Sequence, residues 1–396
     1  PQGRDLPELR RYIFGDSVDF VAVKRLSLRV FAPCKCREIQ GKIQPENPKI
    51  PEFSLSENPE NPRICPGHER CIPIQEIVET LDLREEGIET LLCYLELHPR
   101  NFLELFPPTF SRCRIRCSGG SRQLRELARS SPPLAVVLAR ERSAGQDPSG
   151  SVEFDVISLS DSMGWESPLV KRSLRQLQWN SKGTGNPRNS LEILGSLRES
   201  LEFNHSSETG GKSGITVEFL ELSFHFRAFG DLNSQELDSI VEFLHSRTVS
   251  REKEELRKLR SCFRAFRSVA FQSCLPWPPD KEEEEKSSRL KELLREYFER
   301  DGPGSDREDE DEEEEKNLGI AQDWESQIRA DIRHFLAIHP DETFSGRAIA
   351  RIFHGIGSPR FPAQIYGRDR RFWRRHLPLE FQSLSRLATE EILAFR

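Results

Sequence analysis

The sequence has no long apolar run. Its longest clean run, LAVVLA at 134–139, is far shorter than the roughly 20 apolar residues that cross a bilayer. No signal peptide is recognisable at the start of the chain, and we expect no membrane partner. Because the chain begins with Pro1 rather than Met, we expect it to be an internal piece of a longer protein.

Regularly spaced cysteines are also lacking. The nine cysteines are an odd number at irregular intervals, whereas a secreted disulfide framework is more regular. We therefore expect the protein to work in a reducing compartment.

A complete nucleotide-binding loop is absent as well. The stretch GGKS at 210–213 ends like a P-loop, but that motif requires glycine at position 206, which is Ser206. No Ser-His-Asp or Cys-His arrangement and no acid/base pair can be argued from the order of the residues. We predict no catalytic and no cofactor-binding residues. Without a Walker A motif or a DExH box, the chain by itself should not hydrolyse ATP.

The net charge of −7 comes from two acidic runs, and the rest of the chain has an excess of basic residues. The runs EEEE at 282–285 and DREDEDEEEE at 306–315 hold 13 acidic residues, so the 58 basic residues exceed the other 52 acidic ones by six. The remaining parts of the chain are therefore mildly basic. This pattern fits a protein that binds a polyanion and carries an acidic spacer.

At 396 residues the chain is long enough for two or three domains. We predict an α+β, mainly α fold with a zinc-binding segment, tandem winged-helix units and a small helical C-terminal domain. Helical periodicity covers 4–31, 233–271 and parts of 324–396. We further expect two helices at 152–164 and 166–179, a short helix at 288–298, an extended segment at 109–117 and a strand pair at 214–229. The expected parts are listed in chain order: a helical segment at 1–31, a zinc-binding and first winged-helix unit at 32–150, a second winged-helix unit with a long inserted wing loop at 151–232, a basic amphipathic helix at 233–275, an acidic disordered linker with one short helix at 276–323, and a basic helical domain at 324–396.

One constellation has the composition of a metal site. It reads C-x-C-x28-C-x2-H and consists of Cys34, Cys36, Cys65 and His68. Three thiolates and one imidazole complete a tetrahedral zinc site, which would be structural because no position stays open. Such a metal would tether the Pro-rich loop at 37–62. From spacing alone, free cysteines in a reduced protein remain an alternative, and Cys71 is a rival ligand.

Three sets of basic residues are candidate DNA contacts, since guanidinium groups neutralise phosphates. An ordinary solvated face is the alternative for each set. In the C-terminal set the interleaved aromatic residues could stack on bases or form the core of the small domain. The third set lies on the candidate recognition helix of the second winged-helix unit. The residues are Arg257, Arg260, Arg264 and Arg267 on one helix; Arg347, Arg351, Arg368, Arg370, Arg371, Arg374 and Arg375 near the C-terminus; and Lys171, Arg172 and Arg175 on the recognition helix.

Several segments together resemble the RecQ helicases of the Rothmund–Thomson syndrome branch. They are VDFVAVKRLSLRVF, GHER, IETLLCYLELHPR, SVEFD with DSMGWE, LRQLQW, ARIFHGIGSPRFPAQIYGRDRRFWRRHL and LATEEIL. The resemblance covers nearly the whole chain and departs from the family at 180–214, which is longer here.

The resemblance implies an ATP-dependent 3′→5′ DNA helicase whose two motor lobes precede Pro1, so that ATP and Mg²⁺ belong only to the intact parent. It also implies structural zinc on Cys34, Cys36, Cys65 and His68. The implied partners are single-stranded, forked or duplex DNA and replication and repair proteins. The implied roles are DNA replication, recombination and repair in the nucleus, with mitochondrion and cytoplasm as further locations. The alternative hypothesis is a non-enzymatic winged-helix adaptor for DNA or protein, whose acidic linker would imitate DNA.

Overall fold

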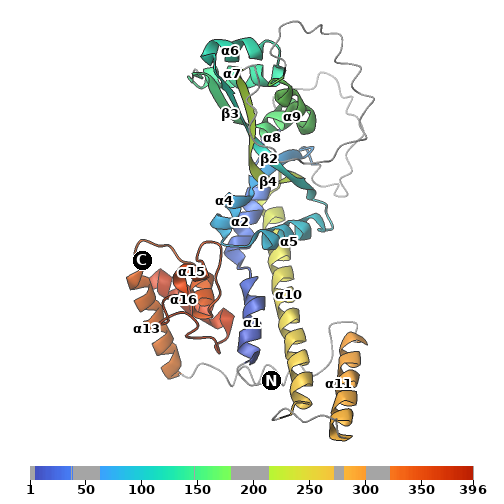
Figure 1. Cartoon of the computed structure of the whole chain (residues 1–396), viewed down its shortest axis with the longest axis vertical. Coiled ribbons are helices and arrows are strands. Elements are labelled where there is room, and N and C mark those ends of the chain that lie inside the picture. The colour runs from blue at the N-terminus through green and yellow to red at the C-terminus, as the bar shows by residue number, and fades with distance from the viewer. Residues whose placement is uncertain are drawn as a thin grey trace. The chain divides into compact units, whose positions relative to one another are not determined.

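The computed structural model describes residues 5–36, 38, 63–146, 148–179, 214–271, 281–299 and 322–395 (Figure 1). The chain divides into two compact units built from alternating segments. Unit 1 comprises Pro1–Leu28, Ile77–Leu95 and Asn233–Arg396, and unit 2 comprises Arg29–Glu76 and Glu96–Leu232.

Unit 2 is organised around one antiparallel sheet with strand order β1-β4-β2-β3. Its two long central strands, β2 (Leu103–Cys117) and β4 (Ile215–Ala228), run from the pair Leu103/Ala228 to the pair Cys117/Ile215. The short β1 (His68–Pro73) pairs with the C-terminal half of β4, and β3 (Ser151–Asp155) pairs with the C-terminal half of β2. Alternation of side chains along β2 explains its two faces: Cys113, Ile115 and Cys117 are buried, and the arginines between them point outward.

Four helices of unit 2 pack with the sheet around one apolar core. They are α6 (Gly120–Ala128), α7 (Pro132–Ser143), α8 (Val156–Met163) and α9 (Ser167–Gln176). The Asp155 carboxylate caps α8 by accepting from the Ser158 N–H at 2.7 Å. Gly164 ends α8 with a φ of 65°, a left-handed conformation that glycine adopts without strain. Pro168 is the second residue of α9, and residues 164–166 form the short turn that joins α8 to α9.

Unit 1 is helical in its described residues. Its longest helix, α10 (Ser234–Ser268), begins with a capping box in which Asn233 and Glu236 exchange side-chain-to-backbone hydrogen bonds of 2.8 and 3.0 Å. The other helices are α1 (Asp5–Gly15), most of α2 (Phe20–Val30), of α4 (Ile74–Leu81) and of α5 (Glu85–Glu96), α11 (Lys281–Glu299), α13 (Gln322–Ile338), α14 (Gly346–Phe353), α15 (Ala363–Tyr366) and α16 (Phe381–Phe395).

The core of unit 1 lies where α13, α14 and α16 meet. Phe335, Phe353 and Phe381 are among its largest fully buried side chains, and Phe14 of α1 joins the same cluster. The helix α14 is buried along its whole length, including its two arginines.

Several elements differ from the expected ones. The helix expected over 4–31 breaks into α1 and α2, because the Asp19 carboxylate accepts from the Ala22 N–H at 2.8 Å and starts a new helix. The stretch after Gly150, expected to be all helix, begins with β3. The strand pair expected at 214–229 is a single strand, β4. The acidic α11 extends back to Lys281, well before the predicted short helix.

The predicted α+β and mainly helical class is confirmed. The strands expected of two separate winged units join in one sheet, because β2 pairs with both β3 and β4. The loops at 37–62 and 180–214 lie outside the described residues, apart from Glu38 and Gly214. Among the described helices, none combines the length and the apolar character needed to cross a membrane.

Candidate metal centre and basic faces

The four predicted metal ligands come together in unit 2. The ligand atoms of Cys34, Cys36, Cys65 and His68 all lie within 4.8 Å of one another. Small shifts of these side chains would bring all four atoms to roughly 2.0–2.3 Å from one ion, the bond lengths of zinc sites. Three thiols with one imidazole are the donor set of structural zinc sites. The rival ligand Cys71 lies on β1 opposite His225 and is not part of this cluster.

The Gly230 carbonyl and the Asp231 carboxylate hold the two cysteine segments together. The Cys34 N–H donates to the Gly230 carbonyl at 2.9 Å, and the Cys65 N–H donates to the Asp231 carboxylate at 3.1 Å. A Cβ atom at Gly230 would lie 2.7 Å from the Cβ atom of Cys34, so only glycine fits between the ligand loop and Arg70. The metal centre therefore depends on residues that follow β4 as well as on its own ligands.

The orientation of His68 is fixed by a carboxylate. Its Nε2 atom faces the thiols, 3.2 Å from Cys36 Sγ, and its Nδ1 atom lies 2.8 Å from Asp161 Oδ2. Burial alone would lower the pKa of His68, but the hydrogen bonds to Asp161 and Cys34 raise it above its ordinary value. Nothing in the spacing of the sequence connects Asp161 with a histidine 93 positions earlier.

The thiols differ in their affinity for protons. Burial raises the pKa of Cys65 and, together with Cys34, raises the pKa of Cys36 to about 12. Burial alone would also raise the pKa of Cys34, but the backbone N–H of Cys36 and the ring of His68 lower it below its ordinary value. Because metal ligands must be thiolates, binding a metal here at neutral pH displaces protons.

A second polar cluster adjoins the metal centre and does not have the geometry of a serine nucleophile with a histidine base. The Glu69 carboxylate accepts from Ser167 Oγ at 2.6 Å and lies 2.7 Å from His225 Nε2. The hydrogen bond from His225 lowers the pKa of Glu69. The carboxylate lies between the serine and the histidine, whereas activation of a serine nucleophile requires the histidine to contact the hydroxyl.

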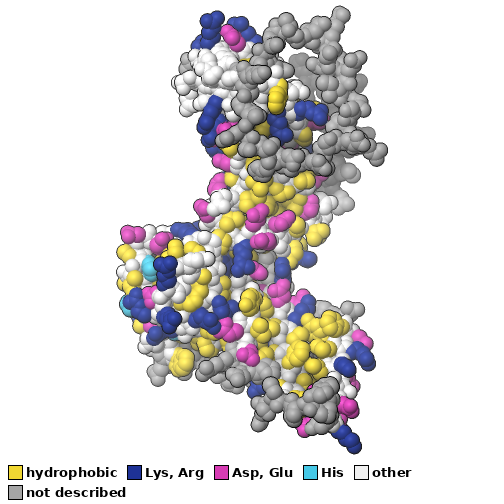
Figure 2. Space-filling view, in the orientation of Figure 1, with side chains coloured by type: hydrophobic (Ala, Val, Ile, Leu, Met, Phe, Trp, Pro, Cys, Tyr) yellow, Lys and Arg dark blue, Asp and Glu magenta, His cyan; other side chains and the backbone are white. Residues whose placement is uncertain are grey.

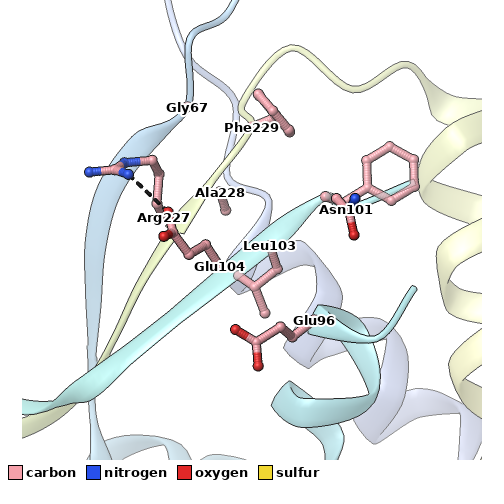
Figure 3. A pocket seen from close by; sticks show the side chains of 9 residues that line it. Gly67, Glu96, Asn101, Leu103, Glu104, Arg227, Ala228 and Phe229 are labelled. Atoms are coloured by element: carbon pink, nitrogen blue, oxygen red, sulfur yellow. Dashed lines mark hydrogen bonds and ion pairs between the residues drawn. The ribbon is translucent and has the colours of Figure 1, made fainter. Parts of the chain in front are cut away.

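The pocket drawn in Figure 3 lies at the end of the sheet near Gly67 and has a volume of about 400 Å³. Its carboxylates already have partners: Glu104 pairs with Arg227 at 2.9 Å, and Glu96 accepts from the Leu105 N–H at 2.8 Å. Phe102 and Phe229 line the same pocket. This lining supplies no pair of groups placed for acid–base chemistry.

The structure separates the predicted C-terminal arginines into two groups. Arg347 and Arg351 are 4% and 2% exposed, and their guanidinium groups donate to backbone carbonyls of unit 1. They are therefore not accessible to a phosphate in this structure. The exposed group consists of Arg368, Arg370, Arg371, Arg374 and Arg375. Three of these have carboxylate partners: Arg371 with Asp369, Arg374 with Glu8, and Arg375 with Asp331.

Aromatic residues between these arginines mostly form the core. Phe353, Phe361, Tyr366 and Phe372 are all at most 9% exposed, and Trp373 is half-buried. The core interpretation is thus confirmed for the four buried rings. On the face shown in Figure 2, Lys and Arg side chains lie among apolar and acidic ones over the C-terminal helices.

The two other basic sets lie on helices. On α10, Arg257, Arg264 and Arg267 are exposed and Arg260 is half-buried. On α9, Arg172 and Arg175 are exposed, and the guanidinium carbon of Arg175 lies 5.0 Å from the ring centre of Phe219. Lys171 is half-buried and its ammonium donates to Thr109 Oγ1 at 2.5 Å.

Comparison with known proteins supports the family resemblance that the sequence motifs indicate. No model of a known protein family matches the chain. Human ATP-dependent DNA helicase Q4 is 48% identical over 414 residues, which cover 99% of this chain and 32% of that protein, and the mouse protein of the same name is 45% identical over 99% of the chain and 30% of its own length. ATP-dependent DNA helicase Q-like 5 of Arabidopsis thaliana is 22% identical over 86% of the chain and 31% of that protein. The chain thus spans about a third of the length of these relatives, and its resemblance to the RecQ helicases is confirmed.

Proposed function

We propose that this chain, homologous over nearly its whole length to part of the ATP-dependent DNA helicase Q4 proteins, is the zinc-stabilised DNA-binding region of such a helicase. The observation that carries the proposal is the Cys₃His cluster within a chain of this homology. The region would bind DNA and position it for a motor that lies elsewhere in the parent, during DNA replication, recombination and repair in the nucleus. ATP and Mg²⁺ would act on that motor.

Zinc has a structural role in this proposal. Cys34, Cys36, Cys65 and His68 would hold the ion, which supplies a fixed tetrahedral crosslink and leaves no position for substrate. The ligands come from two segments, 34–36 and 65–68, that are otherwise joined to each other through the residues after β4. The crosslink would thus fix the start of β1, which is an edge strand of the sheet.

The first prediction concerns zinc content. Purified chain should contain about one equivalent of zinc by atomic analysis, and Cys65→Ala should lose it because three ligands on this scaffold no longer close the site. Cys113→Ala is the matched control, since Cys113 is also buried in unit 2 but lies outside the cluster. Absence of zinc from the wild type, or its retention by Cys65→Ala, would contradict the assignment.

DNA contact is proposed for the exposed arginines of α9, α10 and the C-terminal cluster. On α9, Arg172 and Arg175 lie on the helix that follows the helix–turn in unit 2, as a recognition helix does. In the C-terminal cluster, Arg368 and Arg370 have no ion-pair partner among the described residues. Arginines that are not held by a carboxylate can bind phosphate without first losing an ion pair.

The second prediction tests this distinction. Replacing Arg368 and Arg370 by Gln should weaken DNA binding and reduce the slope of log K against log salt by about one unit for each lost phosphate contact. Fluorescence anisotropy with forked and single-stranded DNA at several salt concentrations measures both quantities. Arg329→Gln is the control, because Arg329 is engaged by Glu325, Glu390 and Glu391. An unchanged affinity and slope would show that the cluster is a solvated or protein-binding face.

A non-enzymatic winged-helix adaptor is the second candidate function, since the chain itself has no P-loop. The coding sequence upstream of Pro1 separates the two candidates. A P-loop followed by a DExH box there supports the helicase, and an uninterrupted reading frame without them supports the adaptor. DNA-stimulated ATP hydrolysis by the chain as it stands would contradict both.

A further inference from the structure

Two consecutive residues of β1 reach two different helices. His68 is a ligand of the proposed metal centre through Nε2, and its Nδ1 atom lies 2.8 Å from Asp161 Oδ2 on α8. The other oxygen of the same carboxylate, Oδ1, accepts from the Glu69 N–H at 2.9 Å. Asp161 therefore binds both the ring of a metal ligand and the backbone beside it, which fixes β1 against α8 at two points.

Glu69 makes the corresponding contact with α9. Its carboxylate accepts from the hydroxyl of Ser167, the first residue of α9, at 2.6 Å. Ser167 is only 3% exposed, so its hydroxyl is directed into the protein. The same carboxylate contacts His225 of β4, which ties the contact to the sheet.

These contacts bracket the turn between the two helices. Asp161 lies in the last turn of α8, Ser167 begins α9, and the connection between the helices is only residues 164–166. The position of α9 and of its exposed arginines therefore depends on where β1 holds these two side chains. A metal ion that fixes His68 would fix β1, and through it both helices.

We propose that Asp161 is a positioning residue of the metal centre and that Asp161 and Glu69 transmit metal occupancy to α9. The inference rests on the proposed zinc centre and goes beyond it, because it assigns a role to residues that touch neither metal nor DNA. Asp161 orients the imidazole with Nε2 toward the metal, the arrangement in which a carboxylate partner strengthens a histidine ligand.

The test begins with zinc affinity, measured by competition with a chelating dye. Asp161→Asn should bind zinc 10–100-fold more weakly than the wild type, the usual effect of losing such a partner. The Co²⁺-substituted protein should keep its thiolate charge-transfer bands, since all four ligands remain. Glu166→Gln is the matched control: it removes the same charge from the adjacent turn, where the side chain is exposed and makes no capping hydrogen bond. Its affinity should stay within twofold of the wild type.

Hydrogen exchange then tests the connection to α9 without relying on any one variant. Removing zinc from the wild type with a chelator should speed exchange of the α9 amides. Ser167→Ala should speed the same amides with zinc bound, while its zinc affinity stays at the wild-type value. The inference would be overturned if Asp161→Asn and Glu166→Gln bound zinc with equal affinity. It would also be overturned if removing the metal left the exchange rate of the α9 amides unchanged. A wild type that takes up no zinc would overturn the metal centre itself, which is a distinguishable result.

Discussion

At the scale of single residues, His354 is an unusual buried base. It is 1% exposed, lies edge-on to the rings of Phe14 and Phe381, and neither of its ring nitrogens has a hydrogen-bond partner among the described residues. Burial lowers the pKa of His354, and the nearby positive charges of His376 and of two arginines of α1 add to this effect. Together they bring the pKa to about 3. The imidazole is thus neutral in the folded protein at any pH above about 3.

This burial makes the stability of unit 1 depend on pH. In the unfolded chain the pKa of histidine is about 6.5, so below that pH the unfolded state binds a proton that the folded state does not. Stability is therefore lost as the pH falls from 6.5 toward 3, and a single such group contributes about 2 kcal/mol of loss between pH 7 and pH 5.

The third prediction follows from this sign. His354→Leu removes the titrating group and two unpaired polar atoms, so it should keep or increase stability at pH 7 and lose about 2 kcal/mol less than the wild type on acidification to pH 5. Urea unfolding at both pH values measures this difference. His334→Leu, at an exposed position on α13, should keep the wild-type profile. A profile for His354→Leu that matches the wild type would mean that the imidazole becomes protonated inside the fold.

At the scale of elements, α14 is held by buried charge rather than by apolar contact alone. Arg351 donates to the carbonyls of Asp82, Gly15 and Ser17, each at 2.9 Å. Arg347 donates to the carbonyls of Leu81 and Ser17. The two side chains thus join α14 to the turn after α1 and to the turn after α4. Those carbonyls end helices and would otherwise lack partners.

The fourth prediction concerns this connection. Arg351→Met should destabilise α14 by about 3–5 kcal/mol, because it leaves buried carbonyls and the Asp82 carboxylate without their cation. Arg351→Lys should also destabilise it, because a single ammonium cannot reach carbonyls on two turns as the guanidinium does. Native-state hydrogen exchange of the α14 amides gives the free energy of opening.

Arg370→Met, at an exposed position, is the control and should change stability by no more than about 0.5 kcal/mol. Equal effects of the substitutions at 351 and 370 would show that the buried hydrogen bonds contribute nothing.

Helices were predictable from the sequence wherever a periodic pattern coincided with local signals. The break between α6 and α7 at Ser131-Pro132 is an example. Strand pairing was not predictable, because β4 pairs with β1 and β2 across 98 residues or more and no local pattern indicates the partner strand. A strand pair was expected where β4 lies, although no Gly, Pro, Asn or Asp between Ile215 and Ala228 marks a hairpin turn. The five-residue β3 is too short for its period to be separated from that of the following helix.

The candidate site, too, was only partly predictable from the sequence. Cys34, Cys36, Cys65 and His68 form a recognisable spacing, and the structure brings them together. Asp161 and Asp231 were not found, because their partners are 93 and 166 positions away. Arg347 and Arg351 were grouped with the exposed arginines, because composition alone does not show which side of a short helix will be covered.

At the scale of the whole molecule, the chain alternates between its two units, yet the metal ligands and their hydrogen-bond partners all belong to unit 2. Each unit has its own apolar cluster, one around Ile115 and Leu174 and the other around Phe335 and Phe353. A ligand that binds only the folded state stabilises the part of the protein to which it binds, by about 4 kcal/mol when its concentration is a thousand times its dissociation constant.

The fifth prediction is that metal removal acts on one unit. Treatment with a chelator should speed hydrogen exchange of the β2 and β4 amides and lower the thermal transition that these strands report, because the zinc crosslink no longer stabilises unit 2. Exchange of the α14 and α16 amides in unit 1 should stay unchanged, and re-adding zinc should restore the strands. His354→Leu is the converse control, since its effects on stability and on pH response are expected in unit 1 alone. Equal losses of protection in both units on metal removal would instead make the metal a determinant of the whole fold, which the placement of its ligands does not predict.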